Sequence, residues 1–352
     1  MGSVKDLEVR RRPTEIMMGD GVFHFSDRYS VFDWGEMPDH IVNKGASLCA
    51  ISAYFFEQLG KRDIVTHYRG VNTGDKYGPL DDTKEAPTKM RVALARVIKP
   101  IVTVAEDGEV TYDYTLVRDA PGNFVIPVEA IYRNSLPKGS SVFRRLKEGT
   151  LTLEEMGLSA MPVEGQRLSA PFVDGSTKYE EFDRYPGWMA LQYLAGLDND
   201  EVRNLQAAVL KGNEVITEGM SRAGFFNEDG KLEFVFTPTR TLMVGDTLGT
   251  LDECRITYNG VDVNKQIPRD WYAYSQPEWK NEIDVAKKVN KKDWKSRVTS
   301  QPEPLLPALK NVMEALYASV ANRVLGRDLF PGVVPVDKIL AEYQRFRDAE
   351  MK

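Results

Sequence analysis

Cysteine and histidine are scarce in this 352-residue chain, which has two cysteines and three histidines. Cys49 and Cys254 provide no disulfide framework and are typical of a reducing compartment. His24, His40 and His67 lie far apart in the sequence. We therefore expect neither a disulfide-stabilised domain nor a histidine-rich zinc site.

Long apolar runs and an excess of positive charge are also missing. No run approaches the roughly 20 apolar residues that a membrane-spanning helix needs, and the N-terminus has no segment resembling a signal peptide. The 46 Lys and Arg residues against 52 Asp and Glu give a net charge of −6, which argues against a general nucleic-acid binder. We predict a soluble, cytoplasmic protein that binds neither nucleic acid nor membrane.

The order of sequence patterns predicts an α+β fold of two lobes. The first 127 residues are rich in short β-like runs, with a helix at 46–59. The rest, 128–352, mixes strands and helices and ends in a helical tail. We expect a ligand cleft between the lobes. The elements predicted from pattern are strands within 4–9, 22–25, 91–104, 110–117 and 123–132, helices at 198–223, 304–325 and 336–347, and a long loop over 149–180.

Acids and bases alternate along one strand-like stretch near the middle of the second lobe. Asp229, Lys231 and Glu233 recur at every second residue, so they share one face of a strand, while Leu232 and Phe234 point to the other. A charged face backed by apolar residues suits a site that holds a metal and a phosphorylated substrate. The same pattern is typical of a solvated sheet face, so the stretch alone leaves both interpretations open.

Further motifs lie on both sides of this stretch, and together they carry a family resemblance. They are, in order, Asp27-Arg-Tyr-Ser-Val-Phe-Asp33, Lys44-Gly45, Pro127-Val-Glu129 with Arg133, Gly139-Ser140, Gly245-Asp246, Asp252 with Arg255, and Lys265 with Arg269. Over residues 2 to about 272 the sequence resembles the SAICAR synthetase family, the phosphoribosylaminoimidazole-succinocarboxamide synthases. Residues 273–352 do not align with the family core.

The resemblance implies the fold and an ATP-dependent ligase activity in purine biosynthesis. The expected reaction joins the carboxylated aminoimidazole ribotide CAIR to L-aspartate, giving SAICAR, ADP and phosphate. A carboxylate is a poor acylating agent, so transfer of the γ-phosphoryl group would first make an acyl phosphate that the amine can attack. Catalysis of this kind depends on charge neutralisation and positioning. The implied small-molecule partners are ATP with Mg²⁺, CAIR and L-aspartate.

The resemblance also assigns roles to individual residues. Glu233 and Asp246 would hold Mg²⁺, which prefers one or two carboxylates plus phosphate oxygens. Lys231 would lie beside the reacting groups, and Asp252 with Arg255 would contact the imidazole. The ATP set comprises Lys5, Val125 in the adenine-contacting strand, Lys178 and Glu233. The ribotide set comprises Arg133, Ser140, Ser141, Arg255, Lys265 and Arg269, with Ser30, Asp33 and Lys44 placed loosely in the substrate pocket.

Several positions depart from the family pattern and predict a divergent, archaeal-like branch. Ser3 replaces a lysine, Glu253-Cys254 replaces small residues, and the Arg133-to-Ser140 spacing is one residue longer than usual. Three alternatives therefore stay open: a related carboxylate–amine ligase with other substrates, a small-molecule phosphotransferase, and a non-catalytic nucleotide-binding relative. The chain lacks the H-R-D and G-x-G-x-x-G motifs of kinases. A homo-oligomer is possible from the resemblance.

Overall fold

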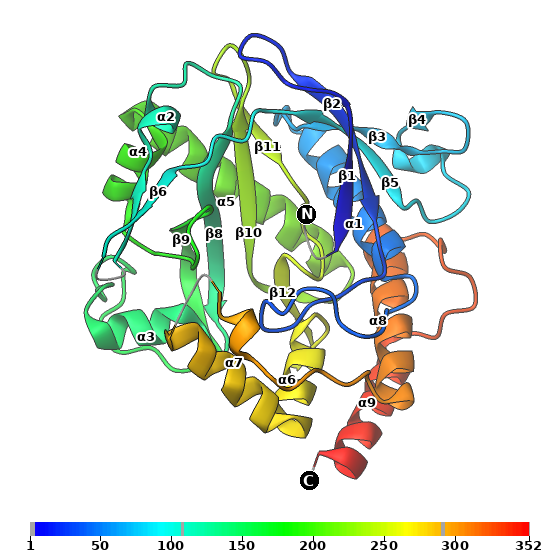
Figure 1. Cartoon of the computed structure of the whole chain (residues 1–352). Helices are drawn as coiled ribbons and strands as arrows, with labels where there is room; N and C mark the ends of the chain where they lie inside the picture. The colour runs from blue at the N-terminus through cyan, green and yellow to red at the C-terminus, as the bar shows by residue number, and fades with distance from the viewer. Residues whose placement is uncertain (1–3, 107–108, 290–292, 352) are drawn as a thin grey trace.

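Two antiparallel sheets form the frame of the protein, described here from a computed structural model of residues 4–106, 109–289 and 293–351. The N-terminal sheet has the strand order β1-β2-β5-β3-β4, and the larger sheet the order β13-β12-β10-β8-β9, with β11 also paired to β10 (Figure 1). The strands are β1 Lys5–Arg11, β2 Gly19–Phe25, β3 Tyr68–Asn72, β4 Tyr77–Gly78, β5 Lys89–Leu94, β6 Ile101–Val104, β7 Val110–Asp113, β8 Val125–Leu136, β9 Gln166–Thr177, β10 Phe226–Phe236, β11 Leu242–Gly245, β12 Cys254–Tyr258 and β13 Val261–Asp262.

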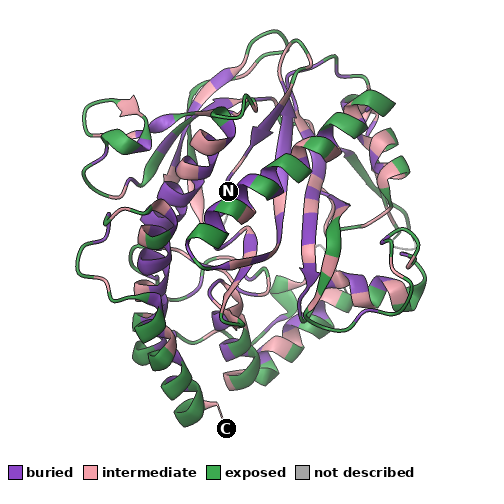
Figure 2. Cartoon of the chain, turned by 180° about the vertical axis from the view of Figure 1, so that it is seen from behind, coloured by how far each residue is buried: buried purple, intermediate pink, exposed green. Residues whose placement is uncertain are grey.

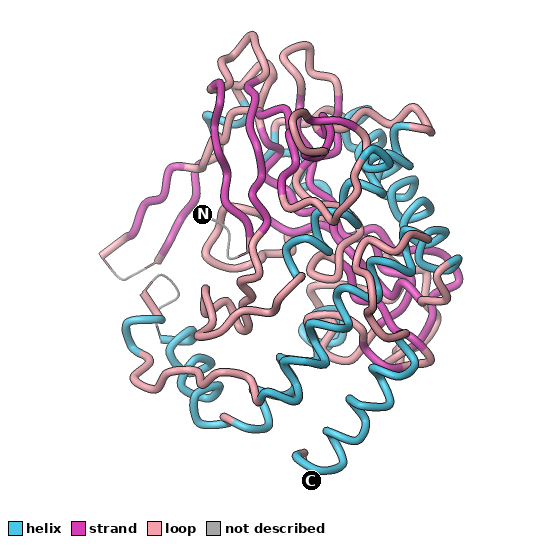
Figure 3. Tube along the Cα trace, turned by 90° about the vertical axis from the view of Figure 1, so that its right-hand side faces the viewer, coloured by secondary structure: helices cyan, strands magenta, loops and turns pink. Residues whose placement is uncertain are grey.

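Helices cover one face of the larger sheet and one side of the molecule. Seen from behind, the long helix α5 crosses the sheet with its exposed side outward (Figure 2). Helix α1 packs against α8, and α8 against α9, so the C-terminal tail is joined to the core through α1 (Figure 1). Figure 3 shows that the chain ends in a helix. The helices are α1 Lys44–Gly60, α2 Thr115–Arg118, α3 Ser141–Glu148, α4 Trp188–Ala195, α5 Asn199–Arg222, α6 Gln266–Ser275, α7 Pro277–Val289, α8 Pro307–Leu325 and α9 Val336–Glu350.

Strand β10 has two faces of opposite character, as its sequence predicts. Leu232 and Phe234 are buried, and a Cβ added to Gly212 of α5 would approach Leu232 Cδ2 to 2.6 Å, so α5 packs closely on this face. The other face carries Asp229 and Glu233, which are 5% and 8% exposed. Because these two carboxylates are buried, this face is not a solvated surface. The alternation of charges along β10 therefore does not mark an exposed sheet face.

The structure corrects the predicted loop over 149–180. Its second part is β9, a 12-residue strand paired with β8 from Val128↔Thr177 to Leu136↔Gln166. The strand was missed because it lies at the edge of the sheet and carries Pro171 and polar side chains in place of a clear apolar alternation.

Two shorter β predictions in the first lobe also change. The run 91–104 divides at Pro100 into β5 and β6. The run 110–117 ends as a strand at Asp113, whose side chain accepts a hydrogen bond from the backbone N–H of Thr115 (2.8 Å) and opens the short helix α2. The predicted helices at 46–59, 198–223, 304–325 and 336–347 correspond to α1, α5, α8 and α9.

Candidate active site

The charged face of β10 links three separate groups of side chains. Asp229 accepts a hydrogen bond from Arg255 Nε (2.8 Å), Lys231 Nζ lies 3.0 Å from Glu129 Oε1, and Glu233 pairs with Lys178. Successive members of the row stand roughly 6.6 Å apart, since a strand rises about 3.3 Å per residue. One strand thus places an arginine-bound acid, a lysine and a second acid in line.

A cavity of about 720 Å³ lies at the Glu233 end of this row, between the two sheets. Its volume is in the range of pockets for drug-sized ligands, and apolar side chains make up much of its wall. The charged groups Lys178, Glu233 and Asp246 lie at its lining, as does Val125. The lining residues are Leu7, Val9, Arg12, Pro13, Phe23, His67, Ala93, Leu94, Ala95, Arg96, Val97, Ile98, Val125, Lys178, Tyr179, Glu233, Val235 and Asp246.

Two carboxylates and two lysines meet at the edge of this cavity, and all of them except Lys5 line it. Glu233 pairs opposite Gly245 in the β10–β11 ladder, so Asp246 follows directly beside it. Lys5 Nζ lies 2.9 Å from Asp246 Oδ1, and Lys178 pairs with Glu233. Burial, with the nearby charge of Asp246, raises the pKa of Glu233. Burial also opposes ionisation of Asp246, but Lys5 and Lys178 outweigh it and lower the pKa of that carboxyl.

This donor set fits a magnesium–nucleotide complex. Glu233 and Asp246 supply hard carboxylate oxygens, and the two lysines already act as counter-cations to them. Within residues 4–106, 109–289 and 293–351 there is no group of three or more His, Cys, Asp or Glu side chains that could hold a metal. A cation held by two carboxylates would take its other ligands from phosphate oxygens and water, as Mg²⁺ commonly does.

His67 holds Asp246 in place, a role that the sequence did not indicate. Asp246 has a left-handed backbone (φ 57°), which is uncommon for a residue with a side chain. His67 Nε2 donates a hydrogen bond to its carbonyl oxygen (2.9 Å), which requires the Nε2–H tautomer. Burial lowers the pKa of His67 to about 4, so the ring is neutral near pH 7.

A smaller cavity of about 360 Å³ lies at the Lys231 position of the row. Lys44 Nζ donates to Asp252 Oδ2 (2.6 Å), and Lys265 Nζ donates to the backbone carbonyl of Asp252. Residues of the predicted substrate set therefore meet here, although 208 positions separate Lys44 from Asp252. The lining residues are Val4, Tyr29, Ser30, Asp33, Gly35, Ile41, Lys44, Lys231, Asp252, Glu253, Lys265, Pro268, Arg269 and Tyr317.

Lys231 lies between two carboxylates. Its Nζ is 3.0 Å from Glu129 Oε1 and 3.3 Å from Glu253 Oε2. Glu253, with Glu129, raises the pKa of Lys231 despite its burial, so this side chain is a permanent cation. Glu253, one of the positions predicted to depart from the family pattern, thus contacts the central lysine directly.

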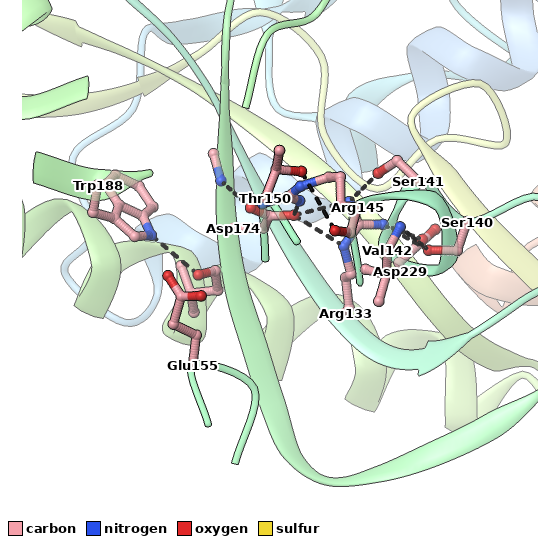
Figure 4. A network of polar contacts seen from close by, with 12 residues as sticks. Arg133, Ser140, Ser141, Val142, Arg145, Thr150, Glu155, Asp174, Trp188 and Asp229 are labelled. Carbon is pink, nitrogen blue, oxygen red and sulfur yellow. Dashed lines mark hydrogen bonds and ion pairs between the residues drawn. The ribbon is translucent and has the colours of Figure 1, made fainter. Parts of the chain in front are cut away.

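Arg133 forms the centre of a buried network of arginines and aspartates (Figure 4). It donates to Asp174 Oδ2 (3.1 Å) and to Asp229 Oδ2 (3.4 Å). Arg145 also binds Asp174 (2.6 Å), and Arg255 binds Asp229. Three guanidinium groups share two carboxylates here, and the carboxyl groups of Glu228 and Asp262 also act on Arg255.

The start of α3 adds hydroxyl donors to this network. Arg133 Nη1 lies 3.4 Å from Ser140 Oγ, and Nη2 lies 3.3 Å from Ser141 Oγ. Ser140 is the N-cap residue of the helix, so backbone N–H groups and the positive end of the helix dipole also point here. Guanidinium groups, hydroxyls and a helix start together suit an anion such as a phosphate.

Three predicted residues line the cavities expected for them and also make contacts within the protein. Val125 lines the larger cavity, but its N–H donates to the carbonyl of Arg96 (2.8 Å), so this N–H is not free for adenine. Ser30 Oγ accepts a hydrogen bond from the N–H of Gly35 (3.1 Å) and closes a turn. The side chain of Asp33 is 81% exposed and pairs with Lys287. Ser3 lies outside the described residues.

Other functional side chains were missed or left unassigned at the sequence level. Glu129 belongs to a motif but received no role, although it contacts the central lysine. Asp174 directly precedes the Gly175-Ser-Thr-Lys178 segment, so a strand prediction there would have drawn attention to it. Arg145 and Tyr317 carry no local sequence signal, because their partners are 29 and 65 positions away.

Comparison with known proteins identifies the family. The SAICAR synthetase family model matches residues 16–286. A protein of Archaeoglobus fulgidus, provisionally named as a phosphoribosylaminoimidazole-succinocarboxamide synthase, is 42% identical over 94% of this chain and 95% of its own.

Two solved structures have the same fold. A Saccharomyces cerevisiae SAICAR synthase complexed with SAICAR has a TM-score of 0.60 at 21% identity, covering 93% of each chain. A type-2 SAICAR synthetase in complex with ADP has a TM-score of 0.54 at 19% identity, covering 86% of this chain and 99% of its own. In the described part of the chain, no helix is both long and apolar enough to cross a membrane. This chain belongs to the SAICAR synthetase family.

Proposed function

We propose that the protein is an ATP-dependent carbon–nitrogen ligase that condenses CAIR with L-aspartate to give SAICAR, ADP and phosphate. One observation carries this proposal. Lys231 stands at the smaller cavity, and Glu233, two residues along the same strand, stands at the larger one. A nucleotide in the larger cavity and a ribotide in the smaller one would thus meet along one face of β10.

The larger cavity is proposed to take ATP with Mg²⁺. Its apolar wall suits an adenine, and Lys5 and Lys178 would turn from their carboxylate partners to phosphate oxygens. Glu233 and Asp246 would hold Mg²⁺, which when bound would neutralise charge on the phosphates. The ADP complex of a protein with this fold supports the nucleotide assignment.

The smaller cavity and the arginine network are proposed to take the ribotide. Asp252 and Arg255 would contact the imidazole, with Lys44 holding Asp252 in place. Lys265 and Arg269 lie one helical turn apart at the start of α6 and would bind the 5′-phosphate. Arg133, Ser140 and Ser141 would complete that anion site.

The residues supply positioning and charge in each chemical step. The γ-phosphoryl group passes from ATP to a carboxylate oxygen of CAIR, with ADP leaving. Lys231, a permanent cation, is placed to balance the charge that builds up between the two substrates. The aspartate amine then attacks the acyl carbon, the C–O bond breaks, and phosphate leaves with that oxygen.

Three broader expectations accompany this proposal. We propose a division into a nucleotide-binding lobe, residues 1–127, and a substrate and metal lobe, residues 128–352. Val125, two residues before the proposed boundary, lines the larger cavity, which supports a boundary beside the proposed nucleotide site. A cytoplasmic location and a possible homo-oligomeric state stay predictions from the sequence.

An omission assay tests the proposed reaction. The protein is incubated with ATP, Mg²⁺, CAIR and L-aspartate, and ADP release is followed with each component left out in turn. We expect sustained ADP release only in the complete mixture, because phosphate leaves only when the amine attacks. ADP release at the same rate without CAIR or without aspartate would contradict the proposed ligase activity.

A further inference from the structure

The C-terminal segment reaches the smaller cavity through a buried tyrosine of α8. Tyr317 is 1% exposed, lines the cavity, and donates a hydrogen bond from its hydroxyl to Asp252 Oδ1 (2.8 Å). The other carboxylate oxygen of Asp252 accepts from Lys44, which is also 1% exposed. Two donors, one on each oxygen, therefore hold this carboxylate in a single orientation.

The polar groups around Asp252 keep it ionised. Burial opposes ionisation, but Lys44, Lys265 and the Tyr317 hydroxyl outweigh it and lower the pKa of Asp252. Arg269 also faces it from α6. A carboxylate has about four lone-pair positions, and the two side-chain donors occupy two of them. The oxygens therefore keep the capacity to accept hydrogen bonds from a ligand in the cavity.

The same segment also supports the loop that forms the rim of the cavity. Lys287 Nζ contacts the Phe32 carbonyl (2.9 Å) and Asp33 Oδ2 (2.7 Å), and Lys295 Nζ contacts the Trp34 carbonyl (2.6 Å). Phe32 and Asp33 both have left-handed backbones, with φ of 53° and 61°. Such backbones persist only where the surroundings hold them, and the two lysines provide part of that support.

From this geometry we propose that helix α8 forms part of the ribotide site, with Tyr317 as a positioning residue that presents Asp252 to the N–H and O–H donors of the aminoimidazole ribotide. The proposal rests on the proposed function, since it takes CAIR as the occupant of the smaller cavity. It assigns a role in substrate binding to a helix that lies beyond residues 16–286, the part of the chain that the family model matches. The prediction that alignment with the family ends near residue 272 is corrected at the same time, since the match continues to residue 286.

Tyr317→Phe tests the proposal, with Tyr343→Phe as the matched control. Tyr343 is a buried tyrosine of α9 in the same tail and does not line the cavity. A hydrogen bond to a charged group contributes enough that its loss should weaken CAIR binding about tenfold, measured by calorimetry. The KM for ATP should stay unchanged. Because the hydroxyl helps to lower the pKa of Asp252, its removal should also move the acidic limb of CAIR binding to higher pH.

The outcomes separate this proposal from the proposed function. CAIR affinity of Tyr317→Phe within about twofold of Tyr343→Phe would overturn the role of Tyr317. Equal changes in the constants for CAIR, ATP and aspartate would also overturn it, because they would indicate a general structural defect. A wild-type protein that does not bind CAIR would contradict the proposed function itself, whichever result the variants gave.

Discussion

Replacing Glu233 with glutamine is expected to lower kcat by about 100-fold or more while leaving CAIR affinity nearly unchanged. The change removes one carboxylate charge from the proposed magnesium pair and keeps the size of the side chain. Glu233 lines the larger cavity and not the smaller one, so the ribotide contacts stay intact. Single-turnover rates and CAIR calorimetry measure the two effects separately.

Glu214→Gln is the matched control for this experiment. Glu214 lies on α5 outside both cavities, and its side chain is 61% exposed and pairs with Arg62 (3.5 Å). The same substitution there should leave kcat within about twofold of wild type. If Glu233→Gln loses CAIR affinity and turnover to the same extent, the residue contacts the ribotide or serves the fold, and the magnesium assignment is wrong.

Replacing Arg133 with methionine is expected to cost about 3 kcal/mol of unfolding free energy, because it leaves buried carboxylates with fewer partners. Asp174 and Asp229 keep Arg145 and Arg255 respectively, which limits the loss. The substitution also removes one guanidinium group from the proposed anion site, so CAIR affinity should fall about tenfold or more. Denaturant unfolding and calorimetry measure the two effects.

Arg144→Met provides the control for the arginine network. Arg144 lies on α3 one residue before Arg145, but its side chain is 61% exposed and pairs only across the surface with Glu148. Exposed pairs of this kind contribute at most about 1 kcal/mol. Wild-type CAIR affinity in a folded Arg133→Met protein would show that the network is structural and that the phosphate binds elsewhere.

Much of the catalytic face could be predicted from sequence because a strand places alternate residues on one side. The spacing of Asp229, Lys231 and Glu233 predicts a shared face, and the structure confirms it. The turn that brings Asp246 beside Glu233 is also local, since β10 and β11 form a hairpin. The family resemblance, which rests on the order of the motifs, also placed Lys44 and Asp252 in the substrate pocket, although they lie far apart in the sequence. In the structure, Lys44 Nζ lies 2.6 Å from Asp252 Oδ2.

Contacts between segments without a local pattern could not be predicted. Asp174 lies in an edge strand whose polar sequence resembles a loop, so its pairing with Arg133 is visible only in three dimensions. Tyr317 reaches Asp252 because α8 packs on α1, and neither helix carries a sign of that pairing in its sequence. These contacts form between buried polar side chains, and whether a polar side chain is buried depends on the whole fold.

Transfer of oxygen from CAIR to phosphate tests the acyl-phosphate account most directly. CAIR labelled with ¹⁸O in both carboxylate oxygens is turned over with ATP and L-aspartate, and the released phosphate is analysed by mass spectrometry. The account predicts one ¹⁸O atom in each phosphate, since the oxygen that leaves the acyl carbon departs with the phosphoryl group. Phosphate without ¹⁸O, formed together with SAICAR, would contradict it.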